Sequence, residues 1–175
     1  PGDFQWIGRL PRLRILELGG TNVTDDDLPP IGDLQGLGDL DLGETAVTDA
    51  GVAHLAPIHS LYVLHLSRTR ITSESLRLAG RNRKLMRLYV HHTAVDDAGL
   101  AHLRPLDSLL TLDLRGTLVT DRGLSVLLSL TTLQDVWDNH GSAIGFETHE
   151  WLEVANLTID IGIRVDGLTA LMLVV

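Results

Sequence analysis

Cysteine is absent from this chain of 175 residues, and positive charge is scarce. Without cysteine the chain forms neither a disulfide scaffold nor a thiolate metal site, which fits a cytoplasmic protein and also a secreted one held together by its core alone. The 14 basic residues are outnumbered by 23 acidic ones, and the net charge of −9 repels nucleic acid and anionic membranes. We therefore expect no nucleic-acid partner and leave the compartment open, with the cytoplasm slightly favoured.

Long apolar runs and enzyme motifs are also missing. No run approaches the roughly 20 residues of a membrane-spanning helix, and no basic start followed by an apolar run resembles a signal peptide. The sequence lacks HExxH, GxSxG and a glycine loop that could cradle a phosphate. We therefore expect neither catalysis nor a cofactor. The apolar fraction of 44% is nevertheless ample for one packed domain.

Leucine recurs at a fixed interval of 24 residues, and such a period is typical of a solenoid. The six positions are Leu13, Leu37, Leu61, Leu85, Leu109 and Leu133. Five consecutive segments align on this period without an insertion, namely LRILELGGTNVTDDDL, LGDLDLGETAVTDAGV, LYVLHLSRTRITSESL, LMRLYVHHTAVDDAGL and LLTLDLRGTLVTDRGL. Their shared template is LxxLxLxxTx[VI][TD]DxGL.

This template resembles the leucine-rich repeat family, specifically the 24-residue form that is common in bacterial repeat proteins and akin to the repeats beside some F-box domains. Threonine stands here where those repeats often carry asparagine or cysteine. The resemblance covers about residues 4–132. It implies an α/β leucine-rich repeat solenoid with a right-handed coil, a parallel sheet on the concave side and short helices on the convex side.

The residue types within each copy predict one coil made of a strand, a turn, a short helix and a return. The alternation in residues 61–66 predicts a strand with one buried face. We expect the recurring threonine hydroxyls to bond the turning backbone of neighbouring coils; these are Thr21, Thr45, Thr69, Thr93 and Thr117. Helix N-caps are expected at Thr24, Thr48, Thr72, Asp96 and Thr120. The aspartate that follows most of these caps suits the positive end of a helix.

Three segments are expected along the chain. Residues 1–12 end a preceding repeat, residues 13–132 form five repeats, and residues 133–175 form a degenerate repeat and a C-terminal cap. Because a solenoid must cover its apolar ends and the amino terminus shows no cap, we expect the chain to be a fragment of a larger protein. The third repeat departs from the consensus on its convex side, where we expect looser packing, at Ser73, Ser75, Ala79 and Asn82.

The strand side chains that face the concave surface are not needed for the core, the turns or the helix caps of the repeat. They form columns in which successive residues lie about 4.8 Å apart. The middle column is acidic and aromatic and has arginines beside it, a combination typical of interface anchors. We predict that this surface binds the ligand, through Asp41, His65, Arg87, Tyr89, His91, Asp113, Arg115 and Trp137.

The sequence offers two other candidate sites. A divalent metal is conceivable where His65 lies between Asp41 and Tyr89, but the arrangement is unspecific and the sheet is open to water, so we expect neither a metal nor an active site there. A basic segment on the convex side is either a solvated helix face or a docking patch for an acidic partner. Its residues are Arg77, Arg81, Arg83, Lys84 and Arg87.

The sequence thus predicts a protein-interaction module that binds a protein or peptide on its concave face. Two alternatives stay open. The chain could be the substrate-recruiting segment of a larger enzyme or ubiquitin-ligase-like protein, or it could be a structural subunit docked in a larger assembly.

Overall fold

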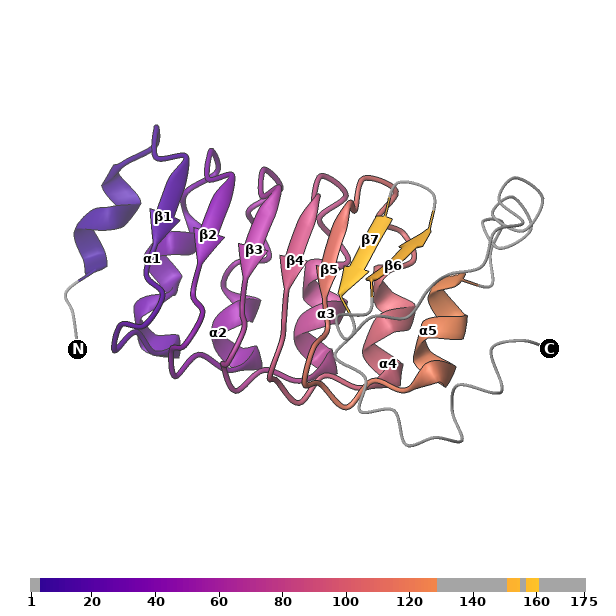
Figure 1. Cartoon of the computed structure of the whole chain (residues 1–175). Coiled ribbons are helices and arrows are strands. Elements are labelled where there is room, and N and C mark those ends of the chain that lie inside the picture. The colour runs from indigo at the N-terminus through magenta and orange to yellow at the C-terminus, as the bar shows by residue number, and fades with distance from the viewer. Residues whose placement is uncertain (1–3, 129–150, 155–156, 161–175) are drawn as a thin grey trace.

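The computed structural model describes residues 4–128, 151–154 and 157–160. Within them the chain winds in regular coils, each with one short strand and one or two short helices (Figure 1). The strands are β1 (Ile15–Glu17), β2 (Asp39–Asp41), β3 (Val63–His65), β4 (Arg87–Tyr89), β5 (Thr111–Asp113), β6 (Trp151–Val154) and β7 (Leu157–Asp160). The α-helices are α1 (Pro29–Gly32), α2 (Asp49–Ala53), α3 (Ser73–Ala79), α4 (Asp97–Leu100) and α5 (Asp121–Leu128), and the 3-10 helices are η1 (Phe4–Arg9), η2 (Asp25–Asp27) and η3 (Ala101–Leu103).

The seven described strands form one sheet in the order β1-β2-β3-β4-β5-β7-β6. Strands β1 to β5 are parallel, and the residues that pair across each step are 24 positions apart, as in Leu16↔Leu40 and Leu40↔Leu64. The row of strands lies on one side of the solenoid and the row of helices on the other (Figure 1). Strands pack about 4.8 Å apart and helices about 8–10 Å apart, so the sheet lies on the inner, concave side. The predicted α/β leucine-rich repeat solenoid is confirmed.

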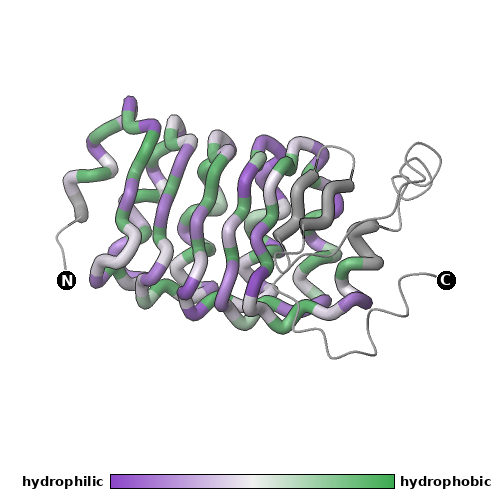
Figure 2. Tube along the Cα trace, viewed as in Figure 1, coloured by the Kyte–Doolittle hydropathy of each residue, from purple (hydrophilic) through white to green (hydrophobic). Residues whose placement is uncertain are grey.

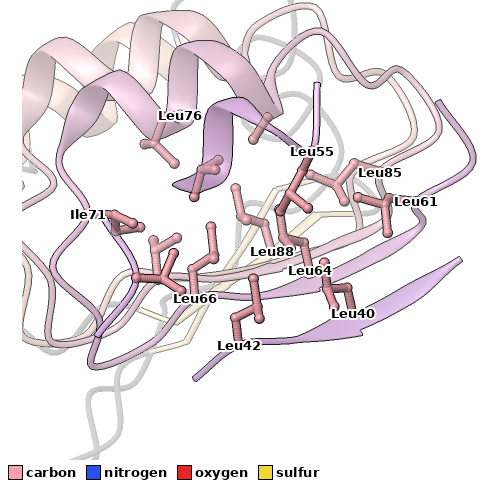
Figure 3. Close-up of a cluster of buried hydrophobic side chains, with 14 of the residues drawn as sticks. Leu40, Leu42, Leu55, Leu61, Leu64, Leu66, Ile71, Leu76, Leu85 and Leu88 are labelled. Atoms are coloured by element: carbon pink, nitrogen blue, oxygen red, sulfur yellow. The ribbon is translucent and has the colours of Figure 1, made fainter. Parts of the chain in front are cut away.

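The core lies between the sheet and the helices. Polar and apolar residues alternate along the strands (Figure 2), and the central residue of each strand from β1 to β5 points inward. Leu40, Leu88 and Leu112 are fully buried there. Figure 3 shows how the leucines of the strands meet those of the helices, for example Leu64 and Leu76. Each coil therefore buries its apolar side chains against the coils before and after it.

The recurring threonines act within their own coil, which corrects the expected bond to neighbouring coils. In each case the hydroxyl donates a hydrogen bond of 2.6 Å to the carbonyl oxygen three residues earlier, as Thr45 does to Leu42. The same bond recurs at Thr21, Thr69, Thr93 and Thr117. The side chain thus satisfies a carbonyl at the end of the strand, where the backbone turns away from the sheet.

Most neighbouring coils are joined by a carboxylate at the start of a helix, and we call this contact between coils the clasp. The carboxylate of Asp25 accepts hydrogen bonds from the backbone N–H (2.7 Å) and the hydroxyl (2.6 Å) of Thr48 in the next coil. Asp97 binds Thr120 in the same way, with two bonds of 2.6 Å. Thr48 also caps α2 as predicted, since its hydroxyl accepts the N–H of Ala50 at 3.2 Å. The aspartates therefore connect two coils, a role that helix propensity alone does not reveal.

The third clasp is reversed. Ser73 stands where the other coils carry the aspartate, and Asp96 stands where they carry the cap threonine. The hydroxyl of Ser73 donates to the carboxylate of Asp96 at 2.5 Å and accepts the backbone N–H of Asp96 at 3.0 Å. Asp96 caps α4 through the N–H of Ala98 at 3.1 Å. The two side chains have exchanged positions, and the hydrogen bonds between the coils are preserved.

The third coil satisfies its unusual polar residues internally. Ser75 is completely buried, and its hydroxyl donates to the carboxylate of Asp49. Burial of Asp49 favours a higher pKa, but hydrogen bonds from Ser75 and Thr72 outweigh it and hold the pKa of Asp49 below its ordinary value. The side-chain amide of Asn82 donates to the carbonyl oxygen of Leu61 at 2.9 Å. A cavity of about 20 Å³ remains between α2 and α3, where looser packing was expected.

After β5, the paired residues of neighbouring strands are no longer 24 positions apart. Strand β7 is the parallel neighbour of β5, and Asp113 pairs with Asp160 rather than with the residue 24 positions on. Strand β6 then pairs antiparallel with β7. Apart from these two strands, the segment expected to form a degenerate repeat and a cap lies outside the described residues.

The reversed clasp can be tested by exchanging its charges. Ser73→Asp places a second carboxylate against Asp96, and we expect it to lower the free energy of unfolding by about 1–2 kcal/mol, because like charges then face each other at hydrogen-bond distance. Adding Asp96→Thr rebuilds the clasp of the other coils and should restore stability to within about 0.5 kcal/mol of the parent protein. Urea unfolding measures both changes.

Ser73→Asn is the matched control for this test, because asparagine has the shape of aspartate without its charge. We expect it to cost much less than Ser73→Asp. Equal losses for the two single variants, or no recovery in the double variant, would show that the clasp does not act through the charge of Asp96.

Candidate functional site

The sheet brings most of the predicted site residues onto one face. Glu17, Asp41, His65, Tyr89 and Asp113 are paired neighbours from β1 to β5 and form the middle column. The following column lies two residues after the strand ends and holds Gly19, Gly43, Ser67, His91 and Arg115. The rim column lies one residue further and holds Gly20, Glu44, Arg68, His92 and Gly116. The predicted residues therefore share a surface because the strand register aligns them.

The centre of the middle column is aromatic. The rings of His65 and Tyr89 are stacked, with centroids 4.2 Å apart and planes inclined by 13°. Both side chains are half-buried. The two rings hold each other in place, so they offer a preformed flat surface that loses little conformational entropy when a ligand binds.

A trough of about 520 Å³ runs beside this column. Its floor is low because the column beyond the strands carries only glycine or serine in three successive coils, at Gly19, Gly43 and Ser67. Longer side chains stand on both sides. The middle column contributes Glu17, Asp41, His65 and Tyr89, the rim contributes Glu44 and Arg68, and His91 closes one end.

Asp41 lies across the floor of the trough. The backbone N–H of Gly43 donates to its Oδ1 at 2.8 Å. A Cβ atom at Gly19 would lie 2.8 Å from its Oδ2, so this aspartate needs a glycine in the preceding coil. The carboxylate is therefore fixed by its own turn and by the absence of a side chain at Gly19, and it stays half-exposed.

Asp113 has a different role from Asp41, although both occupy the middle column. Its side chain is only 2% exposed, and Arg115 covers it through hydrogen bonds of 2.9 Å from Nε and 2.6 Å from the terminal nitrogen. Burial alone would raise the pKa of Asp113, but the bonds from Arg115 outweigh burial and keep the pKa below its ordinary value. The two charges compensate each other inside the chain, which leaves Asp113 little capacity to recognise a ligand.

The two adjacent histidines have distinct conformations. Burial lowers the pKa of His91, and the nearby carboxylate of Asp113 opposes this only in part, so the imidazole is neutral at pH 7. His92 has a φ of 55°, in the left-handed region that favours glycine. Glu44 and Arg68 share this conformation at φ of 57° and 56°. These are the non-glycine residues with positive φ in the described part of the chain.

The remaining predicted residues lie apart from the trough. Arg87 is exposed at the start of β4, in the column on the far side of Tyr89. Trp137 lies outside the described residues, and its part in the site stays a prediction. On the convex side, Arg77 forms an ion pair with Glu74, and Arg83 lies 4.0 Å from Asp107. The convex basic segment is thus partly neutralised, and Arg87 belongs to the concave sheet instead.

The sequence interpretation missed Glu17, Glu44, Ser67 and Arg68, which line the trough. The signal that could have found them is the run of small residues at Gly19, Gly43 and Ser67. A column of small residues between two columns of long ones predicts a hollow. In the described residues, no group of three histidine, aspartate or glutamate side chains is arranged to hold a metal ion, and no helix has the length and apolarity that a membrane crossing requires.

Solved structures with the same fold are leucine-rich repeat proteins. An internalin (InlF) from Listeria monocytogenes matches 71% of this chain and 35% of its own, at 23% identity and a TM-score of 0.61. Internalin C2 from the same species matches 70% of this chain and 51% of its own, with the same identity and TM-score. A leucine-rich repeat protein from Leptospira interrogans matches 70% of this chain and 37% of its own, at 21% identity and a TM-score of 0.52.

No protein-family model and no curated protein matches the sequence. The chain spans about a third to a half of the solved chains named above. At these identities the likeness shows the fold alone.

The pair of Asp113 and Arg115 provides a test of the structural role assigned to it. We expect Arg115→Ala to lower the free energy of unfolding at pH 7 by about 1–3 kcal/mol, because a buried carboxylate loses its main partner. The pKa of Asp113 should rise in this variant, which carboxyl NMR titration measures. Arg87→Ala, which removes an exposed arginine one strand away, is the control and should cost less than about 0.5 kcal/mol.

The pH dependence of the same pair follows from the sign of the shift. A lowered pKa stabilises the fold above the ordinary value of 3.8, and this stabilisation is lost as the pH falls through the folded value. The stability difference between the parent protein and Arg115→Ala should therefore shrink in acid. A difference that is constant between pH 7 and pH 2 would contradict the assignment.

The two histidines give a second test with an internal control. We expect His92→Gly to raise the free energy of unfolding by about 0.5–1 kcal/mol, because glycine adopts the left-handed conformation without steric cost. His91→Gly should lower it by about 1 kcal/mol, because its backbone gains nothing from glycine. Urea unfolding decides between these signs, and a loss in both variants would show that strain at His92 is negligible.

Proposed function

We propose that this chain, which has the leucine-rich repeat fold, is a recognition module that binds an extended segment of a protein or peptide along the trough of its concave face. The observation that supports this most directly is the trough itself. It crosses four successive coils and presents carboxylates, stacked aromatic rings and an arginine in one continuous hollow of about 520 Å³.

The shape and polarity of the trough favour a polypeptide over a small molecule. Pockets for small molecules are enclosed and mainly apolar. This hollow is open along its length and is lined mostly by polar residues, from Glu17 at one end to His91 at the other. An extended segment that crosses the strands would contact one or two residues in each coil, which suits a repeated sheet.

The rigidity of the sheet supports binding with little loss of entropy. The lining residues lie on strands and turns whose backbone groups are paired from coil to coil, as in the bond from Arg68 N–H to the carbonyl of His91 at 2.9 Å. The His65 and Tyr89 rings are already stacked. Such a preorganised surface leaves the cost of ordering mainly to the ligand.

The central role of Tyr89 is tested with peptides selected from a random library displayed on phage. For the tightest selected peptide, we expect Tyr89→Ala to weaken binding at least about tenfold, because an aromatic anchor at the centre of an interface is lost. Fluorescence anisotropy with the labelled peptide measures the affinity, and urea unfolding confirms that the variant is folded.

Tyr62→Ala is the matched control. Tyr62 is 40% exposed and lies before β3, outside the trough. We expect this variant to change the affinity less than about twofold. Equal effects of the two substitutions, or an unchanged affinity in Tyr89→Ala, would remove the support for the concave trough as the binding site.

A further inference from the structure

The floor of the trough contains a buried polar atom without a partner. Ser67 is 6% exposed and lines the trough, and its hydroxyl forms no hydrogen bond with any described residue. The neighbouring glycine positions have no side chain that could reach it, and the backbone N–H of Arg68 is already bound to the carbonyl of His91. A hydroxyl that is buried without a partner is unsatisfied, and a donor that reaches the floor of the trough would satisfy it.

The charges around this hydroxyl are predominantly negative. Three carboxylates line the trough, at Glu17, Asp41 and Glu44, and the one arginine among the lining residues is Arg68. Arg68 already lies 3.6 Å from Glu44. Glu17 and Asp41 are neighbours on adjacent strands. Because Arg68 is paired with Glu44, no arginine among the lining residues is left to pair with them. The end of the trough adds no positive charge, because burial keeps the pKa of His91 low.

From the unpartnered hydroxyl of Ser67 and the adjacent carboxylates, we infer that the trough is a pocket for an arginine side chain of the bound segment. This inference rests on the proposed function and names the chemistry of its ligand. A guanidinium has five N–H donors in a plane and is weakly hydrated, so it can bond two acceptors at once and lie against an aromatic ring. Asp41 provides the charge, Glu17 on the adjacent strand adds to the negative potential, Ser67 Oγ accepts a further N–H, and His65, which lies between Asp41 and Tyr89 in the column, provides the ring.

Asp41 is suited to this role because its position is already fixed. Its Oδ1 accepts the N–H of Gly43, whereas Oδ2 faces Gly19, where no side chain intervenes. A guanidinium can therefore approach Oδ2 from the open side of the trough without breaking the bond to Gly43. Asp39, two residues earlier on the same strand, lies outside the trough and has no such access.

The experiment is an NMR titration of the ¹⁵N-labelled chain at low ionic strength. The probes are N-acetyl-L-arginine N-methylamide and the citrulline analogue, which has the same shape without the charge. The arginine compound should shift the amide signals of Gly19, Gly43 and Ser67 in a saturable manner, and the citrulline compound should bind at least about fivefold more weakly. Equal binding of both probes, or shifts confined to other surfaces, would overturn the inference.

Three variants test the named residues. Asp41→Asn keeps an acceptor for Gly43 but removes the charge, and Ser67→Ala removes the unpartnered hydroxyl. Each should weaken the arginine compound at least about fivefold. Neither should lower the urea midpoint, because no internal bond is lost. Asp39→Asn is the control and should leave the affinity unchanged, and an equal effect of Asp39→Asn and Asp41→Asn would overturn the assignment.

The outcomes separate this inference from the proposed function. If library peptides bind in a Tyr89-dependent manner and the arginine compound does not bind, the trough is a recognition surface without an arginine pocket. If the arginine compound binds as expected while Tyr89→Ala leaves peptide affinity unchanged, the pocket exists and the proposed peptide path is wrong.

Discussion

The structure depends on one hydrogen-bonded contact between successive coils. A carboxylate at the start of one helix accepts the backbone N–H and the hydroxyl of the residue that caps the next helix, as Asp25 does for Thr48. The contact joins residues 23 positions apart and recurs at this separation from coil to coil. The strands on the other side of the solenoid are thereby aligned residue for residue. Where Ser73 and Asp96 exchange roles, the bonds persist, which indicates that the contact and not the residue type is what the fold requires.

This alignment decides what the concave face can do. Strict register places Gly19, Gly43 and Ser67 in one line, so these three small residues make one continuous hollow and not three isolated gaps. The same register stacks His65 on Tyr89 and sets Asp41 beside them. Function on such a scaffold needs no special local structure. It needs only that neighbouring coils differ at positions that the core and the contacts between coils leave free.

The sequence was sufficient for the coil, the strands and the helix caps, because all three follow from a repeated spacing. It was insufficient where the outcome depends on what one side chain meets in the next coil. Asp41 and Asp113 occupy equivalent positions, yet one is open to the trough and the other is covered by Arg115. The threonine hydroxyls bond within their own coil, to the carbonyl oxygen three residues back. The sequence did not reveal the left-handed backbone of Glu44. Glycine is the residue typical of that conformation, and it occupies the equivalent position in only two other coils, at Gly20 and Gly116.

The proposed ligand site is the trough on the concave face. The most direct measurement is a crystal structure of the chain with a peptide selected from a library. We predict that the peptide crosses β1 to β4, contacts Tyr89 and places a side chain between Asp41 and Ser67. A peptide bound to the convex helices, or along the exposed side chains of Tyr62 and Met86 at the other end of the strands, would contradict it.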